Sequence, residues 1–266
     1  LRQTYIEGIC TGSIANDLTA NIITQLSTAF GSSGLLVAEA AKQPVFSFQK
    51  KIAFLLQNLD VENSDSSYEA VFNMDGTYES AAVAYLYSRI AAAIVEKTAQ
   101  LSAIKVKVSS VGGYYSIIVY KQHKSKSAVE LRKEVTSALV YIYKALQMIS
   151  PDEFNKRKYE TMNYVRMWLE SDQEVHRFLV ENFLQNVKIF DFRSQLQQYL
   201  TNMTPFYFSN YINKFIMNNP STLELLTANP SIYNAVWKEI SAALQSEQNG
   251  TALFLKDQLS AHGKFI

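Results

Sequence analysis

The chain has 266 residues, a length that suits one large domain or one compact domain with an appended tail. Hydrophobic residues make up 48% of it and charged residues only 18%, which excludes a disordered chain, a coiled coil and a collagen-like repeat. With 25 Lys and Arg against 24 Asp and Glu, the net charge is +1, so no strong field attracts nucleic acid or an anionic membrane.

The first part of the chain is predicted to alternate strands with helices. Residues 4–10 are predicted to form a short strand, and apolar residues spaced by three to five predict a helix over 14–30. Residues 44–57 are rich in Val, Phe, Ile and Leu and are predicted to be extended, and 67–75 to form a strand. An alanine-rich helix follows over 77–100, and its few charges predict burial on most sides.

A hairpin is predicted next. Lysine and valine alternate over residues 103–110, as in a half-buried strand, and Gly112-Gly113 turns the chain into a second strand over 114–120. The lysine-rich stretch at 121–126 is predicted to be a solvated loop, and a long helix is predicted over 128–146.

A capping box starts the following helix. Ser150 precedes Pro151 at the first helical position, and Glu153 lies three residues after the cap. Apolar residues carry this helix onward, namely Phe154, Tyr159, Met162, Val165 and Leu169. Three further helices are predicted, over residues 174–187, 191–200 and 204–217.

The order of these elements predicts the fold class. The order is a strand, a helix, two strands, a helix, a hairpin and then a run of helices. It predicts an α+β architecture with an antiparallel sheet covered by helices. Beyond Asn219 the pattern weakens, and residues 232–265 are predicted to be helical and separable. We therefore expect one domain over residues 1–218 and a helical tail extension over 219–266.

The sequence lacks the motifs of several enzyme classes. Neither His-Glu-x-x-His nor its inverse, His-x-x-Glu-His, occurs around His123, His176 or His262. Cys10 is the only cysteine, so no internal disulfide forms, and no Gly-x-Ser-x-Gly elbow or glycine-rich phosphate loop is present. No apolar run is long enough for a membrane span. We predict no catalytic residue, no metal ligand and no cofactor in this chain.

Six short segments occur in a distinctive order. They lie at residues 5–13, 68–75, 100–102, 148–154, 190–192 and 200–204. The segment Met-Ile-Ser-Pro-Asp-Glu-Phe at 148–154, for example, is similar to a Met-Ser-x-Glu-Glu-Phe helix start. In this order the segments resemble the last domain of the C-terminal half of insulinase-type (insulysin or pitrilysin) metallopeptidases.

The resemblance implies that this chain works with a catalytic partner and does not carry out catalysis by itself. In that family the N-terminal half carries the inverted zinc motif, and the C-terminal half closes over it to form a chamber around a peptide. It therefore implies zinc in a partner half, and as partners an N-terminal catalytic half or a paralogous subunit, with a peptide as substrate. The chain begins Leu-Arg-Gln-Thr, without methionine, which we interpret as a piece of a longer protein. Nothing in the sequence indicates a compartment.

The chain departs from the family at one pair of positions. The resemblance implies an Arg and a Tyr, seven residues apart around a Gln-Leu-Gly, that hold the substrate near the zinc. Anchored on Gln100, these positions fall on Glu96 and Ala103, and a register error of one or two residues does not help, since the nearest candidates are Lys97 and Ile104. We therefore predict that the pair is lost.

Three hypotheses follow for the function. The chain is a non-catalytic C-terminal domain of an insulinase-like zinc metalloendopeptidase, forming the wall of the peptide chamber. Alternatively, it is a degenerate homologue that acts as a structural or assembly subunit. The third hypothesis is an unrelated α+β binding module, which would have a different sheet topology. Under the first two hypotheses we expect the chain alone to hydrolyse nothing.

Overall fold

The computed structural model describes residues 51–58, 65–111, 114–167, 192–219, 222–229 and 231–245, with short pieces at 20–22, 24–25, 28, 46–47, 180, 252–255 and 264–265. The predicted strand at 4–10 lies outside these residues, as does the predicted helix at 174–187 except for residue 180. The described pieces of the predicted helix at 14–30 are helical.

A six-stranded sheet forms one layer of the molecule. Its strands are β4 (Lys105–Val111), β5 (Tyr114–His123), β3 (Ser66–Asn73), β6 (Thr222–Ala228), β2 (Ile52–Gln57) and β7 (Ala252–Leu255), in that spatial order. Neighbours from β4 to β6 are antiparallel, whereas β2 pairs in parallel with both β6 and β7. A separate pair joins β1 (Phe46–Ser47) to β8 (Lys264–Phe265). The antiparallel sheet that the sequence predicted is present, and two parallel pairings extend it.

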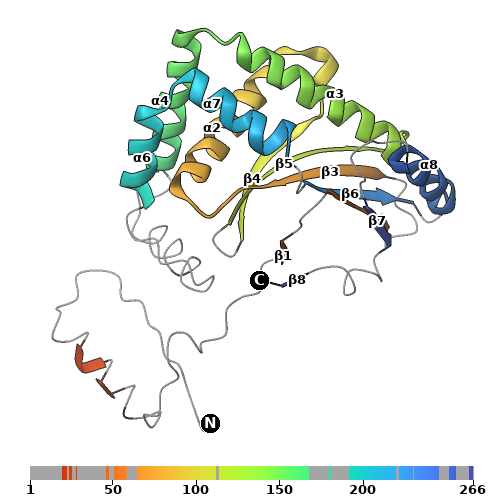
Figure 1. Cartoon of the computed structure of the whole chain (residues 1–266), viewed down its shortest axis with the longest axis horizontal. Helices are drawn as coiled ribbons and strands as arrows, with labels where there is room; N and C mark the ends of the chain where they lie inside the picture. The colour runs from red at the N-terminus through yellow and green to blue at the C-terminus, as the bar shows by residue number, and fades with distance from the viewer. Residues whose placement is uncertain are drawn as a thin grey trace.

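Helices cover one face of this sheet, as Figure 1 shows. They are α2 (Tyr78–Lys97), α3 (Ala128–Gln147), α4 (Pro151–Met167), α6 (Phe192–Asn202), α7 (Pro205–Ile212) and α8 (Tyr233–Gln245). Short turns follow two of them, η2 (Ala99–Leu101) and the π-helical η3 (Asn213–Met217). The predicted α+β class with a helix-covered sheet is confirmed. Among the described helices, none is long and apolar enough to cross a membrane.

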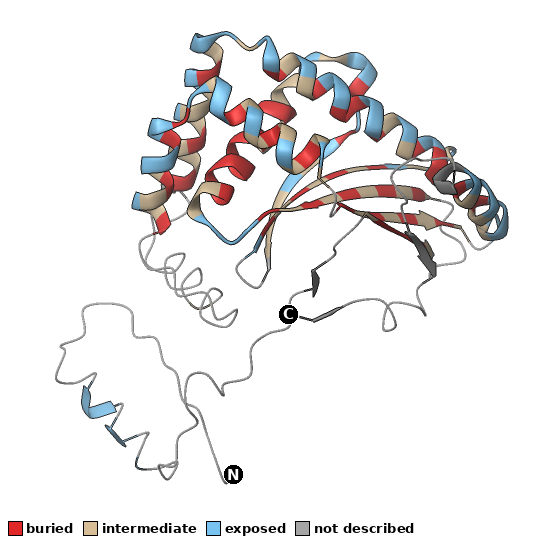
Figure 2. Ribbon diagram, in the orientation of Figure 1, coloured by how far each residue is buried: buried red, intermediate tan, exposed pale blue. Residues whose placement is uncertain are grey.

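The core lies between the sheet and the helices (Figure 2). Alternate residues of β3 and β5 point into it, including Tyr68, Phe72 and Ile117. The alanine-rich part of α2 is buried over Ala81–Leu86 within the same core, because small side chains let the helix approach its neighbours closely. Burial of α2 on most sides was predicted from its lack of charges.

Strand β6 and helix α8, which follow residue 218, belong to the same sheet and core as the rest of the domain, and this corrects the predicted helical tail over 219–266. Strand β6 is an inner strand that pairs with β3 on one side and β2 on the other. Val236 and Ile240 of α8 are buried in the main core. An inner strand bonded along both edges cannot separate from the domain, so the two Asn-Pro steps flank a strand and mark no domain boundary.

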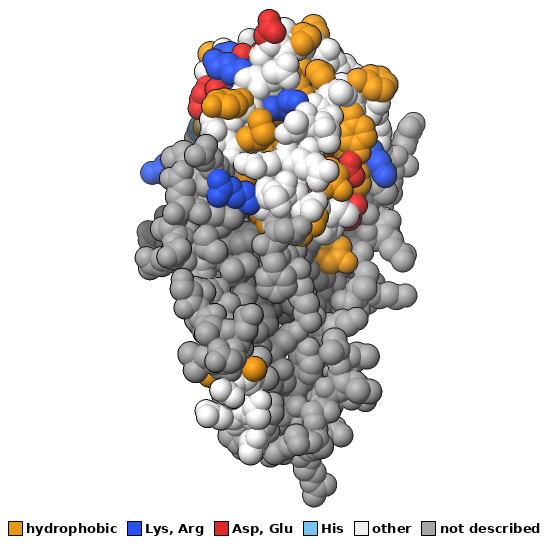
Figure 3. Space-filling model, turned by 90° about the vertical axis from the view of Figure 1, so that its left-hand side faces the viewer, with side chains coloured by type: hydrophobic (Ala, Val, Ile, Leu, Met, Phe, Trp, Pro, Cys, Tyr) orange, Lys and Arg blue, Asp and Glu red, His pale blue; other side chains and the backbone are white. Residues whose placement is uncertain are grey.

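One end of the helical layer exposes aromatic side chains. Tyr159 on α4, Tyr199 on α6, and Phe206 and Tyr207 on α7 are exposed, and Phe206 is the most open of them at 78%. Figure 3 shows hydrophobic side chains spread over this end of the molecule. Tyr159 is one of the apolar residues from which this helix was predicted, and on α4 its side chain lies in solvent.

Candidate functional site

The junction between α2 and β4 holds the two positions at which the family pair was expected. Leu101 and Ile104 are buried and anchor the turn, while Glu96 and Ala103 are exposed on either side of it. Ala103 has a φ of 69°, in the left-handed region that its Cβ disfavours. Both positions are therefore exposed near the α2–β4 junction, Glu96 in the last turn of α2 and Ala103 after η2.

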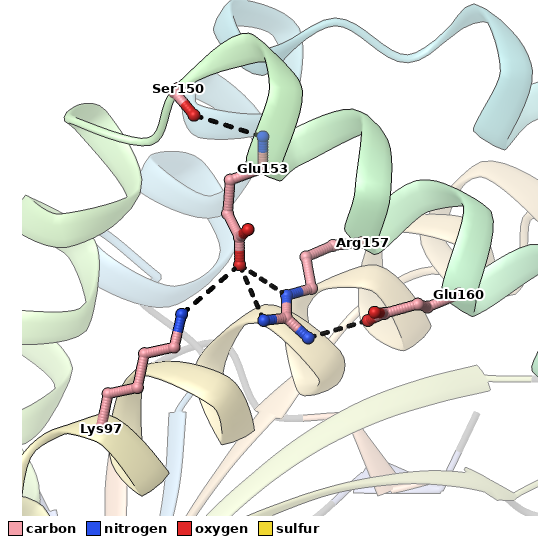
Figure 4. A network of polar contacts seen from close by, with 5 residues as sticks. All are labelled: Lys97, Ser150, Glu153, Arg157 and Glu160. Carbon is pink, nitrogen blue, oxygen red and sulfur yellow. Dashed lines mark hydrogen bonds and ion pairs between the residues drawn. The ribbon is translucent and has the colours of Figure 1, made fainter.

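Lys97, the nearest basic residue, is committed to an ion cluster with α4 (Figure 4). Its Nζ lies 3.7 Å from Oε1 of Glu153, which also accepts hydrogen bonds from Nε and Nη2 of Arg157 at 2.9 and 2.7 Å. Nη1 of Arg157 donates to Glu160 at 2.8 Å. The hydrogen bonds from Arg157, with its charge and that of Lys97, lower the pKa of Glu153.

The capping box predicted at the start of α4 is present in part. The N–H of Glu153 donates to Oγ of Ser150 at 3.2 Å, but the Glu153 carboxylate binds Arg157. A complete box starts α3, where the N–H of Ser127 donates to Glu130 and the N–H of Glu130 donates to Ser127. The Ser-x-x-Glu spacing at 127–130 was visible in the sequence and would have identified it.

The lysine-rich stretch at 121–126 is only partly the solvated loop that was predicted, because only residues 124–126 leave the strand. Strand β5 continues to His123, and Lys121 within it is buried, with its Nζ 2.9 Å from Oε2 of Glu134. Lys126 bonds the same carboxylate, and Lys124 is the exposed lysine of the stretch. The hydrogen bond from Lys126, together with Lys121, lowers the pKa of Glu134. Pairing with Glu134 allows the strand to carry a buried lysine.

The histidines form no metal cluster among the residues that the structure describes. Nδ1 of His123 accepts a hydrogen bond from the N–H of Ser125 at 3.1 Å. His176, His262 and Cys10 lie outside the described ranges. Within those ranges no three His, Cys, Asp or Glu side chains gather as metal ligands would.

A second ion cluster is buried beneath α3, and the sequence analysis did not identify it. Glu224 on β6, whose side chain is 2% exposed, accepts from Nε of Arg132 at 2.6 Å and from Nη2 at 3.2 Å. Nζ of Lys51 lies 2.8 Å from Oε1 of the same carboxylate. Burial alone would raise the pKa of Glu224, but Arg132 and Lys51 lower it overall. The carboxylate is therefore ionised at neutral pH.

Comparisons with known proteins identify the fold. No protein-family model and no curated protein sequence matches the chain. The solved structure of pitrilysin matches with a TM-score of 0.69 and 15% identity, over 96% of this chain and 27% of that chain. The periplasmic protease PqqL from Escherichia coli matches at 0.53 and 13% identity, over 82% of this chain and 24% of that one.

A third solved structure also matches the chain. A peptidase M16 inactive domain from Pseudomonas fluorescens matches at a TM-score of 0.57 and 14% identity, over 81% of this chain and 51% of that chain. The chain thus spans about a quarter to a half of the length of these structures. At these identities the likeness shows the fold. The chain has the fold of a domain of the insulinase-type, or M16, peptidases, as the six collinear segments predicted.

Proposed function

We propose that the chain is a non-catalytic domain of an insulinase-like zinc metalloendopeptidase and that it forms part of the wall of a peptide-enclosing chamber. The observation that carries this proposal is the match to pitrilysin over 96% of the chain, which covers only 27% of that peptidase. In the matched proteins, a domain of this fold is one part of a longer chain. The remaining 73% offers room for a catalytic half that this chain lacks.

The α2–β4 junction supports a non-catalytic role. Glu96 would repel the backbone carbonyls and acidic groups of a peptide that an arginine would attract, and Ala103 has no hydroxyl to donate. Zinc, with its activated water, would be supplied by the partner half. The residues of this chain would enclose the peptide and exclude it from bulk solvent.

The exposed aromatic end of the helical layer supports a packing role. Phe206, Tyr207 and Tyr199 are large, exposed and contributed by neighbouring helices, and aromatic residues of this kind are enriched at protein interfaces. We propose that this surface packs against another part of the parent protein.

The test is reconstitution. The chain is mixed with the zinc-bearing N-terminal half of its parent, and cleavage of a quenched peptide of mixed sequence is followed with and without a zinc chelator. The proposal predicts no cleavage by the chain alone and chelator-sensitive cleavage in the mixture. A stable complex without cleavage would favour the structural or assembly subunit, for which the loss of the Arg and Tyr pair also argues.

Two variants sharpen the test. Phe206→Asp should weaken the complex at least about tenfold if the aromatic end is the interface, because a charge would be buried there. The double variant Glu96→Arg with Ala103→Tyr should increase cleavage in the mixture, since it restores the substrate-holding chemistry. Glu239→Arg on α8, with the same charge change at another exposed site, should leave the rate unchanged.

A further inference from the structure

A cavity of about 520 Å³ lies on the helix-covered side of the sheet. Its lining residues come mainly from β3, β6, α3 and η3, which lie together in Figure 1 with α3 above the strands. This volume lies within the range of about 300–1,000 Å³ that is typical of small-molecule sites. The cavity is therefore large enough for a compact organic molecule.

The two strands give the cavity an apolar and a polar side. Their register places Phe72 of β3 opposite Thr222 of β6, and Ala70 of β3 opposite Glu224 of β6. The apolar lining continues over the adjoining helical elements with Leu139, Val140, Ile216 and Met217. The uncharged polar lining consists of the hydroxyls of Thr136 and Thr222 and the amides of Asn218 and Asn219. A molecule that matches both sides has an apolar body and a polar head group.

The charged residues of the described lining, Lys51 and Glu224, are already paired with each other. Nζ of Lys51 lies 2.8 Å from Oε1 of Glu224, and the same carboxylate accepts from Nε of Arg132 at 2.6 Å. Lys51 and Arg132 each make a further interaction besides these. An ionic ligand would lose its hydration on entering and would find no unpaired counter-ion among these residues. The cavity therefore favours an uncharged ligand.

The side of the cavity at η3 is built before any ligand binds. Residues 213–217 form a π-helical turn, a rare conformation that frequently occurs at functional sites. Nδ2 of Asn219 donates to the carbonyl of Phe215 at 2.9 Å, and Oγ1 of Thr222 donates to the carbonyl of Asn219 at 3.2 Å. Because the Thr222 hydroxyl uses its hydrogen in this bond, its oxygen can still accept a hydrogen bond from a ligand. The polar side thus suits a head group that donates an N–H or O–H.

We propose that this cavity binds a small neutral molecule with an apolar body and a hydrogen-bond-donating head group, such as a primary amide. The apolar body lies against Phe72 and the apolar residues of α3 and η3, and the head group lies at Thr222. This site is independent of the proposed peptidase function, because it uses no residue of the α2–β4 junction and requires no partner half.

The test compares three probes that share a phenyl body on the full 266-residue chain at pH 7. They are the neutral 3-phenylpropionamide, the anion 3-phenylpropionate and the cation 3-phenylpropylamine, and binding is measured by isothermal titration calorimetry. The proposal predicts saturable binding of the amide and at least about tenfold weaker binding of each ion. Equal or tighter binding of either ion, or no binding of the amide at millimolar concentration, would overturn it.

Two matched variants locate the site on α3. Val140→Trp should abolish binding of the amide by filling the cavity, and the 38% exposure of Val140 leaves room for the larger side chain in the folded protein. Tyr141→Trp changes the next residue, which is exposed and is not among the lining residues, and it should bind like the wild type. Amide binding that survives Val140→Trp, or that is lost in Tyr141→Trp, would contradict the proposal. The order of the three wild-type affinities tests it without either variant.

Discussion

Glu224 and Glu153 have the same set of partners in opposite surroundings. Each accepts hydrogen bonds from Nε and Nη2 of an arginine, and each has a lysine as a second cation. The Glu224 side chain is 2% exposed on an inner strand, however, whereas that of Glu153 is 34% exposed on a helix. Removing a partner of Glu224 leaves its carboxylate buried away from solvent. Removing a partner of Glu153 leaves a carboxylate that water can solvate.

The largest expected effect is the loss of Arg132. We expect Arg132→Met to reduce the free energy of unfolding by about 3–5 kcal/mol, because Glu224 is left buried with Lys51 alone. The measurement is urea unfolding followed by circular dichroism. The matched change in the exposed cluster, Arg157→Met, should cost about 1 kcal/mol or less. Equal costs would refute the contrast between the clusters.

The pH dependence of stability tests the ionisation of Glu224. Its pKa is lowered in the folded protein, so its contribution is fully present above the unfolded value of 4.5 and is lost as the pH falls through the folded pKa. We expect wild type to be more stable than Glu224→Gln at pH 7. The difference in their free energies of unfolding should disappear as the pH falls through the folded pKa of Glu224. Urea midpoints measured for both proteins from neutral to acidic pH check this. A gap that persists unchanged in acid would mean that the interaction is not ionic.

The effect of salt on the cost of these two variants is smaller, and it should differ between the exposed and the buried cluster. The cost of Arg157→Met should decrease in 1 M NaCl, where the Debye length is about 3 Å, because the side chains of its neighbours Lys97 and Glu153 are 71% and 34% exposed to solvent. The cost of Arg132→Met should change little, because counterions do not reach Glu224. Parallel urea titrations at low and high salt measure both values. Equal salt dependence would argue against the burial of Glu224.

The smallest expected effect lies in the turn that follows Lys97. The φ of 69° destabilises the folded state with alanine at position 103, whereas glycine adopts this φ freely. Glycine partly offsets that gain because it raises the conformational entropy of the unfolded chain. Ala103→Gly should therefore stabilise the protein by about 0.5 kcal/mol. Thermal unfolding would show this as a small rise in Tm. Destabilisation would indicate that the Ala103 methyl group makes a contact that outweighs its backbone conformation.

The two clusters also show which features could be predicted from the sequence. Glu153 and Arg157 are four residues apart on one helix, so local spacing indicates that they pair. Glu224 and Arg132 are 92 residues apart, and their contact depends on β6 lying beneath α3. No local pattern contains that information.

The same distinction holds for the fold. Helices α2 and α3 and the β4–β5 hairpin could be predicted, because their periodicity and turn glycines are local signals. Strand β6 was missed because it lies between two Asn-Pro steps and carries a glutamate that pairs only in the tertiary structure. The end of β5 was missed for a similar reason, since Lys121 is neutralised by a residue of the next helix. The roles of Glu96 and Ala103 depend on the family resemblance and stay predictions.

In the proposed function this chain contributes enclosure and packing, and no catalytic group, to a zinc peptidase. The most direct measurement is cleavage of a quenched peptide by the purified chain in the presence of added zinc. The account predicts a rate equal to that of buffer, with cleavage appearing only when the catalytic half is added. Chelator-sensitive cleavage by the chain alone would contradict it.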